Sequence, residues 1–221
     1  PLAIIAGQIE LMLHERAADD ADAAELRGLL DEVFRCKQIT GKLLDLARPS
    51  DPHRDRVDLS TVARHVVEGV SGLARQRGCT TIVEAPAPAW AWADELEMRQ
   101  VLLNLLLNAL AAVESGRGQV RLTVTADGGG ASVAVTDNGR GLAPGDVERL
   151  FEPFVTTRRG EAGVGHGLGL AVCRAIVEAH GGRIGLRSEG VGRGAEASFV
   201  IPSTATTQAA AVRAGKEVAA T

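Results

Sequence analysis

The sequence lacks the features of several common classes of protein. Its three cysteines are far apart and odd in number, which fits neither a disulfide framework nor a zinc site, so we expect a reducing, cytosolic setting. The net charge of −4 and the lack of a long basic run argue against nucleic acid as a partner. Every apolar run falls short of the roughly 18 residues that cross a bilayer.

A signal peptide is also missing from the N-terminal end. Pro1 and Leu2 lead directly into an amphipathic pattern. We therefore expect the chain to be the cytoplasmic portion of a longer protein, which a segment upstream of Pro1 could anchor in a membrane.

Residues 1–48 show helical periodicity. Apolar residues recur at spacings of three and four from Leu2 to Met12, and a broader apolar stripe runs from Leu26 to Ala47. The polar stretch 16–23 is the predicted connector. Because the second stripe is wider than a two-helix hairpin can cover, two hairpins packed as a dimeric four-helix bundle would bury it. The alternative is a helical pair that rests on the domain behind it.

Prolines mark the end of this hairpin. Pro49 and Pro52 interrupt the helical pattern, because proline has no backbone N–H to donate and restricts the residue before it. We assign residues 49–55 to a linker and residues 56–202 to the main domain. The tail at 203–221, rich in alanine and threonine, is predicted to be disordered or a further linker.

The pattern of residues 56–202 predicts an α+β fold. Strands and helices do not alternate as they would in a doubly wound sheet, so an α/β sandwich of helices layered on a sheet fits better. Ser60 is the expected N-cap of the first helix. Predicted helices span 60–77, 94–115 and 168–180, and predicted strands span 56–59, 80–84, 90–93, 119–126, 132–137, 183–188 and 196–201.

Two asparagines stand out in the leucine-rich segment 104–109. Asn104 and Asn108 are four residues apart and share one face of the predicted helix. Leucines surround them, so we expect this helix to be buried on nearly all sides. An unpaired buried amide costs about 1–3 kcal/mol, so both side chains need partners. They either cap neighbouring backbone or turn their oxygens toward a phosphate and its metal.

Segment 137–142 (DNGRGL) follows an apolar strand and contains an acidic residue and two glycines. In isolation, Asp-Asn-Gly is most often a turn. Gly139 and Gly141, at alternate positions, would also let a flat ring approach the backbone closely. The carboxylate of Asp137 can accept a hydrogen bond there and cannot donate one.

Two further segments follow in order. Segment 151–154 (FEPF) contains Phe151 and Phe154, which either pack in the core or anchor a loop. Segment 163–170 (GVGHGLGL) places three glycines at the start of the helix predicted at 168–180, where free N–H groups and partial positive charge can hold a phosphate. It is neither a Rossmann fingerprint, since no strand directly precedes it, nor a Walker loop, since no Gly-Lys-Ser/Thr follows.

In this order, the four segments resemble the ATP-binding domain of sensor histidine kinases, in the superfamily shared with gyrase, the MutL repair proteins and the large heat-shock chaperone. The resemblance implies a pocket for ATP and Mg²⁺. In it Asn108 is the metal ligand, Asn104 holds a phosphate or metal-bound water, and Asp137 accepts from the adenine amino group. It also implies a mobile lid at 155–165. The expected nucleotide-binding residues are Asn104, Asn108, Asp137, Gly139, Gly141, Arg158, Gly165, His166, Gly167, Leu168 and Gly169.

The chain departs from the family pattern at three positions. His166 stands where threonine is usual, and it either donates to a phosphate or faces solvent. Ala111 replaces a basic or polar residue, and Ala195 replaces a threonine in the last glycine box. None of these changes removes Asn108, Asp137 or the glycines of the lid.

The phospho-accepting histidine of the family lies outside the chain. It belongs to a motif like His-Glu-x-Arg-Asn-Pro-Leu, whose last two residues match Pro1 and Leu2. The acceptor is therefore expected upstream of Pro1, and no catalytic residue is expected within the chain. His14 lies on the same predicted helix but lacks that context, so we expect a solvated side chain.

The resemblance implies a homodimeric histidine autokinase of a two-component system, which passes the phosphoryl group of ATP to an aspartate of a response-regulator receiver domain. One alternative is a non-catalytic nucleotide-sensing dimer. Another is a conformational ATPase of the gyrase or MutL kind. Those enzymes place a glutamate base where this chain has Asn104, which disfavours activation of water here.

Replacement of Asp137 by asparagine is expected to weaken ATP binding about ten- to a hundredfold, because it removes a charge-assisted hydrogen bond worth roughly 1.5–3 kcal/mol. Isothermal titration calorimetry with ATP and Mg²⁺ measures the change. An unaltered affinity would remove Asp137 from the site.

Overall fold

The computed structural model describes residues 1–14, 21–47, 53–143, 145–156 and 167–204. The chain divides into two compact units, Pro1–Pro49 and Ser50–Thr221. Among the described helices, none is both long enough and apolar enough to cross a membrane.

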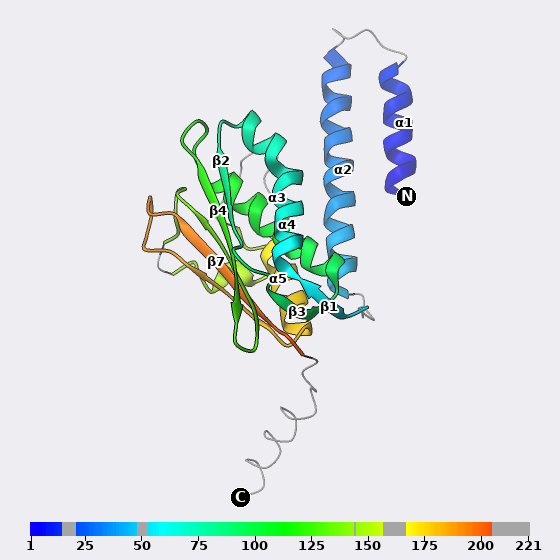
Figure 1. Cartoon of the computed structure of the whole chain (residues 1–221). Coiled ribbons are helices and arrows are strands. Elements are labelled where there is room, and N and C mark those ends of the chain that lie inside the picture. The colour runs from blue at the N-terminus through cyan, green and yellow to red at the C-terminus, as the bar shows by residue number, and fades with distance from the viewer. Residues whose placement is uncertain (15–20, 48–52, 144, 157–166, 205–221) are drawn as a thin grey trace, which may run out of the picture. The chain divides into compact units, whose positions relative to one another are not determined.

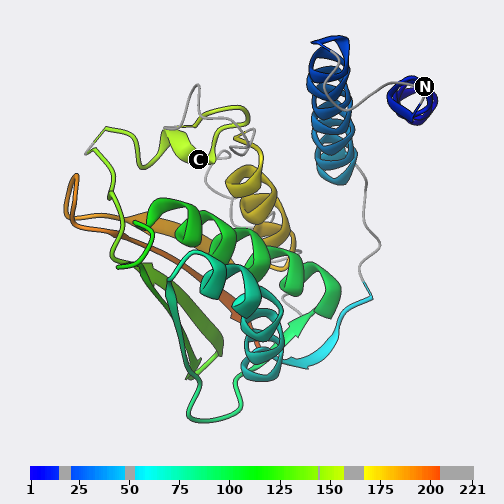
Figure 2. The same cartoon turned by 90° about the horizontal axis from the view of Figure 1, so that it is seen from above.

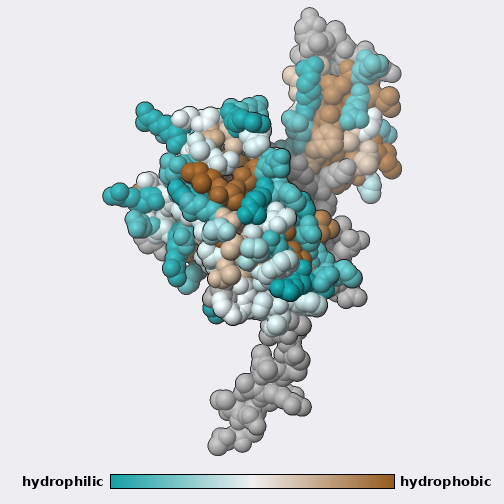
Figure 3. Space-filling view, viewed as in Figure 1, coloured by the Kyte–Doolittle hydropathy of each residue, from teal (hydrophilic) through white to brown (hydrophobic). Residues whose placement is uncertain are grey.

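The first unit is a pair of helices, α1 (Leu2–His14) and α2 (Ala21–Ala47), which lie side by side (Figure 1). Small and branched apolar residues, among them Ala6, Ile9 and Ala23, are buried between them. Larger apolar side chains remain exposed, and Figure 3 shows apolar residues along both helices. The exposed set is Ile4, Ile5, Leu11, Met12, Leu29 and Phe34.

The second unit begins with a small antiparallel sheet. Strand β1 (Asp55–Asp58) pairs with β3 (Trp90–Ala93), so that Asp55 lies opposite Ala93 and Asp58 opposite Trp90. Helix α3 (Leu59–Gln76) follows β1 without a loop.

The expected N-cap of this helix was wrong. The cap is Asp58, whose carboxylate accepts a hydrogen bond from the backbone N–H of Ser60 at 3.0 Å. Ser60 lies inside the first turn, is fully buried, and donates its hydroxyl to the carbonyl of Ala87 at 2.7 Å. Aspartate and serine cap helices about equally well. Ser60 does not cap because its hydroxyl bonds to Ala87 instead, and the sequence does not show that contact.

The main sheet has five strands in the order β2 (Thr80–Glu84), β4 (Gln119–Asp127), β5 (Gly130–Asp137), β7 (Ala195–Pro202) and β6 (Arg183–Arg187). Strand β2 runs parallel to β4, and the other neighbours are antiparallel. Helices α3, α4 (Glu95–Ala112) and α5 (Gly169–Ala179) cover one face of this sheet (Figure 2). The predicted α+β class and layered sandwich are therefore confirmed.

The core lies between this sheet and the three helices. Alternate residues of the central strands are buried, because successive side chains of a strand point to opposite faces. On β4 these are Val120, Leu122 and Val124. The largest fully buried side chains of the unit are Phe199, Leu59, Met98, Leu102, Leu105, Leu106, Leu110, Leu122, Leu168, Ile201, Val101 and Val120.

Helix α4 departs from the expectation of burial on nearly all sides. Leu96, Leu103 and Leu107 are exposed, with 73%, 39% and 38% of their surfaces accessible. The helix begins after its N-cap Asp94 and ends at Ala112, three residues before the predicted end. The apolar residues of α4 that face the sheet form a continuous row. The opposite side of the helix faces solvent, where its side chains can contact a ligand.

Phe199→Ala is expected to lower the free energy of unfolding of the second unit by about 3–5 kcal/mol, because it removes a buried ring and leaves a cavity. Both tryptophans of the chain lie on β3, so their fluorescence during urea denaturation reports on this unit. Val200→Ala, on the opposite face of the same strand, is the control and should cost less than about 1 kcal/mol. Equal losses in the two variants would contradict the assigned core face.

Candidate functional site

Helix α4 carries the two asparagines toward one side of the molecule. Asn104 is half-buried and Asn108 is exposed, while their neighbours Leu105 and Leu106 are buried against the sheet. Neither amide is therefore sealed in the core, and neither needs an internal partner to avoid a desolvation cost. The amide of Asn108 is free to face a ligand from solvent.

The C-terminal end of α4 is fastened to the segment 137–141, here called the acidic turn. A helix ends with carbonyl groups that have no partner within the helix. The carbonyl of Ala111 accepts from the guanidinium of Arg140 at 3.1 Å, and that of Ala112 accepts from the backbone N–H of Arg140 at 3.1 Å. Arg77 donates to the carbonyl of Leu110, also at 3.1 Å. Cations at this end are favoured by the helix dipole as well.

Two glycines allow this close approach. A Cβ atom on Gly139 would overlap the carbonyl oxygen of Ala112. Gly141 has a φ of +63°, which side-chain-bearing residues rarely adopt, and a Cβ atom there would overlap the carbonyl oxygen of Gly190. The sequence suggested that these glycines admit a ligand ring. The structure shows that the packing of backbone against backbone already requires them.

Asp137 ends β5 at the base of the acidic turn. Its carboxylate oxygen Oδ1 accepts from the N–H of Gly139 at 2.8 Å. Burial raises the pKa of Asp137, and the hydrogen bonds from Gly139 and Ala195, with the charge of Arg140, oppose that rise only in part. The ionised carboxylate is thus short of hydrogen-bond donors, so an additional donor from a ligand would stabilise it.

The residue next to it has a structural role that sequence reasoning missed. Asn138 accepts from the N–H of Gln119 at 2.7 Å and donates to the carbonyl of Arg117 at 3.1 Å. These bonds hold the end of β5 against the start of β4 and point the amide away from Asp137's carboxylate. The turn preference of Asp-Asn-Gly was the only signal of this in the sequence.

The start of α5 lies beside Asn108. A Cβ atom on Gly169 would be 3.8 Å from Nδ2 of Asn108, which is ordinary contact distance. Leu168, the N-cap of α5, is fully buried and provides no side-chain hydrogen bond to the first turn. The amide of α4 and the N-terminal turn of α5 therefore face the same space, where first-turn N–H groups can meet an anion.

The residues that flank the predicted lid, here called its stem, are Phe151 to Phe154 on one side and Gly167 on the other. Phe151 is buried, with the guanidinium of Arg174 4.1 Å from the centre of its ring. Phe154 is 54% exposed and has a φ of +66°, and its N–H donates to the carbonyl of Gly167 at 3.0 Å. Phe151 thus anchors the stem, whereas Phe154 does not pack in the core. The predicted residues Arg158, Gly165 and His166 lie outside the described residues.

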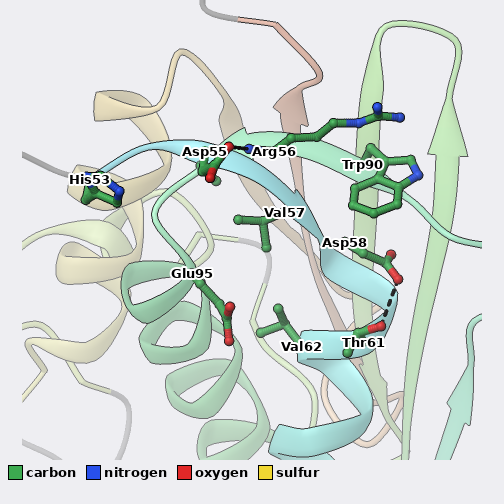
Figure 4. Close-up of a pocket in the computed structure, with 10 residues that line it drawn as sticks. His53, Asp55, Arg56, Val57, Asp58, Thr61, Val62, Trp90 and Glu95 are labelled. Atoms are coloured by element: carbon green, nitrogen blue, oxygen red, sulfur yellow. Dashed lines mark hydrogen bonds between the residues drawn. The ribbon is translucent and has the colours of Figure 1, made fainter.

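A separate hollow of about 430 Å³ lies at β1 and β3 (Figure 4). The sticks of Val57, Val62 and Glu95 point into it, and Arg56 extends over the ring of Trp90, 4.6 Å from its centre. Its lining includes none of the predicted nucleotide residues. In the described part of the chain, no group of three or more His, Cys, Asp or Glu side chains is placed to hold a metal.

Several known proteins are similar to this chain. Sensor histidine kinase ZraS of Escherichia coli (strain K12) is 34% identical over 208 residues, which are 93% of this chain and 43% of ZraS. The structure of full-length ShkA in complex with AMPPNP is 28% identical, with a TM-score of 0.71 over 93% of this chain and 46% of that one. Histidine kinase ThkA in complex with response regulator protein TrrA is 25% identical, with a TM-score of 0.71 over 92% of this chain and 58% of that one.

This chain thus spans less than half the length of ZraS. Residues 93–205 match the family model for histidine kinase-, DNA gyrase B- and HSP90-like ATPases. That span holds α4, the acidic turn and α5. The chain therefore belongs to the family of histidine kinase-, DNA gyrase B- and HSP90-like ATPases.

Proposed function

We propose that this chain is the ATP-binding part of a two-component sensor histidine kinase. One observation carries the proposal most directly. Gly169, at the start of α5, lies beside the amide of Asn108, and Arg140 of the acidic turn donates to the carbonyl groups at the end of the same helix α4. The likeness to ZraS over 93% of the chain favours a histidine kinase within the family.

The adenine ring would bind against the acidic turn. The carboxylate of Asp137, which accepts bonds from Gly139 and Ala195, can accept one more from the adenine amino group, whereas guanine presents an acceptor at the corresponding position. The triphosphate would extend toward the N-terminal turn of α5, where the N–H groups after Leu168 carry no side-chain cap. Asn108, next to Gly169, would then lie beside the phosphates.

The donor set fits Mg²⁺ that is held chiefly by phosphates and water. Mg²⁺ keeps several water ligands and needs only one or two oxygens from protein. The exposed amide oxygen of Asn108 can provide one, and Asn104, on the same face of α4, can hold a metal-bound water. When bound, the ion neutralises charge on the phosphates. The protein's own contribution is to position the nucleotide and exclude water.

The phosphoryl acceptor would be a histidine upstream of Pro1, on the helix that continues into α1. The exposed apolar residues of α1 and α2, such as Ile4, Leu11 and Phe34, support pairing of two hairpins as a homodimer. The structure of ThkA with the response regulator TrrA supports a receiver domain as the second partner.

The affinity for ATP should depend on pH through Asp137. Because burial raises the pKa of its carboxyl group above the usual 3.8, the group takes up a proton at a higher pH than an exposed aspartate. ATP binding should weaken as the pH falls through that raised pKa, since the neutral acid is a poorer acceptor. Calorimetric titrations from pH 7.5 downward, through the raised pKa, test this. Asp137→Asn is the control for protonation of ATP itself, and an equal slope in both proteins would contradict the assignment.

Phosphotransfer tests the whole proposal. A protein extended upstream to include the acceptor histidine, incubated with γ-labelled ATP and Mg²⁺, should gain label that is labile in acid and stable in base. Asn108→Ala should slow labelling at least about a hundredfold, whereas Gln100→Ala, an amide earlier on α4, should not. Binding of ATP without any label would favour a nucleotide-sensing dimer. Steady hydrolysis without label would favour a conformational ATPase.

A further inference from the structure

Helices α4 and α5 lie antiparallel and touch at three points along their lengths. At one end, Gly169 of α5 lies beside Asn108 of α4. In the middle, the thiol of Cys173 points to the carbonyl of Val101, with 3.8 Å between sulfur and oxygen. At the other end, His180 meets Asp94. The end opposite the proposed phosphate site therefore also joins the two helices, through His180 and Asp94.

The contact at that end joins the two helix caps. Nε2 of His180 accepts from the backbone N–H of Asp94 at 3.0 Å, and Nδ1 donates to the carbonyl of Ile176 at 2.8 Å. Both ring nitrogens are thus used, which assigns a neutral ring with its proton on Nδ1. His180 is the C-cap of α5, and Asp94 is the N-cap of α4. The ring is 4% exposed, so water competes little for these bonds.

Arg54, near the start of the second unit, also contacts the C-terminal end of α5. The guanidinium of Arg54 donates to the carbonyl of Ala179, the last residue of α5, at 2.7 Å. In the β1–β3 register, Asp55 lies opposite Ala93, which brings Arg54 level with Asp94. Arg54, Asp94, Ala179 and His180 form one cluster, called here the helix junction. It links the first residues of the unit to both helices of the nucleotide site.

Two polar atoms near the junction make no hydrogen bond in the described part of the chain. Nε of Arg54 and Oε2 of Glu97 are buried without a hydrogen bond. The latter lies 3.6 Å from Nε2 of His180. A cluster selected for stability alone would pair or replace such groups. The presence of these two polar groups agrees with a role in fixing the positions of the two helices, which directional hydrogen bonds do better than apolar contacts.

We propose that Arg54 and His180 are positioning residues for nucleotide binding, because they set the relative position of α4 and α5 and so the spacing between Asn108 and the first turn of α5. This inference rests on the proposed function for its link to ATP. Arg54 follows soon after the start of the second unit at Ser50. A displacement of the backbone at Arg54 would act first on the helix junction and, through α4 and α5, on the phosphate end of the site.

Arg64 provides a matched control. Its guanidinium also donates to a backbone carbonyl, that of Ala85, at 2.6 Å. It lies on α3 and bonds to neither α4 nor α5 in that contact. Arg54→Met and Arg64→Met each remove one arginine-to-carbonyl hydrogen bond and one positive charge. They differ in whether the bond reaches the helix junction and also in burial, since Arg54 is partly buried and Arg64 is exposed.

The experiment compares these variants in the full chain of 221 residues. Relative to Arg64→Met, Arg54→Met should weaken binding of ATP with Mg²⁺ about three- to tenfold in calorimetry. It should also speed hydrogen exchange of the amides at 172–175, which begin the hydrogen-bonded part of α5 at its far end. Arg54→Lys, which keeps a donor and a charge, should recover part of both effects.

The inference is overturned if Arg54→Met and Arg64→Met show the same ATP affinity and the same exchange at 172–175. If Arg54→Met fails to fold, Arg54→Lys and His180→Gln replace it. Their ATP affinity and hydrogen exchange, each compared with those of Arg64→Met, then test the proposal. If the unaltered chain binds no ATP, the proposed function fails. The exchange comparison then still tests the junction, because it needs no nucleotide.

Discussion

The last carbonyl groups of α4 cannot be satisfied within the helix, and the architecture of the second unit depends on the donors that reach them. Arg140 supplies two of these donors and Arg77 a third. The acidic turn is thereby held against the helix that carries Asn108. In the proposed function, the carboxylate of Asp137 and the amide of Asn108 contact one ligand, which requires that these two elements keep a constant distance. The capping of α4 provides that constraint.

Much of the fold could be predicted because its signals are local. The alternation of Val120, Leu122 and Val124 predicts a strand with one buried face, and that face packs on the helices. The order of elements then indicates a layered sandwich. The spacing of Asn104 and Asn108 likewise predicts one shared helix face, and the four motifs in order indicate the family to which residues 93–205 belong.

What escaped prediction depends on contacts between residues far apart in the chain. Ser60 has the chemistry of an N-cap, but the loop at Ala87 takes its hydroxyl, and Asp58 caps instead. Solvent exposure of Leu103 and Leu107 follows from which side of α4 the sheet covers. His180 had no motif to mark it, and its bond to Asp94 spans 86 residues of sequence. Periodicity and spacing contain no information about such pairs.

The order of strands has a consequence for how copies of the protein meet. Strands β2 and β6 stand at the two margins of the main sheet, where unpaired backbone groups invite strand addition and aggregation. Glu84 is exposed at one end of β2, and Arg183 and Arg187 are exposed at the two ends of β6. Charge at these margins discourages a neighbouring molecule from extending the sheet. The homodimer that we propose would then form through the apolar side chains of the helical pair and not through the sheet.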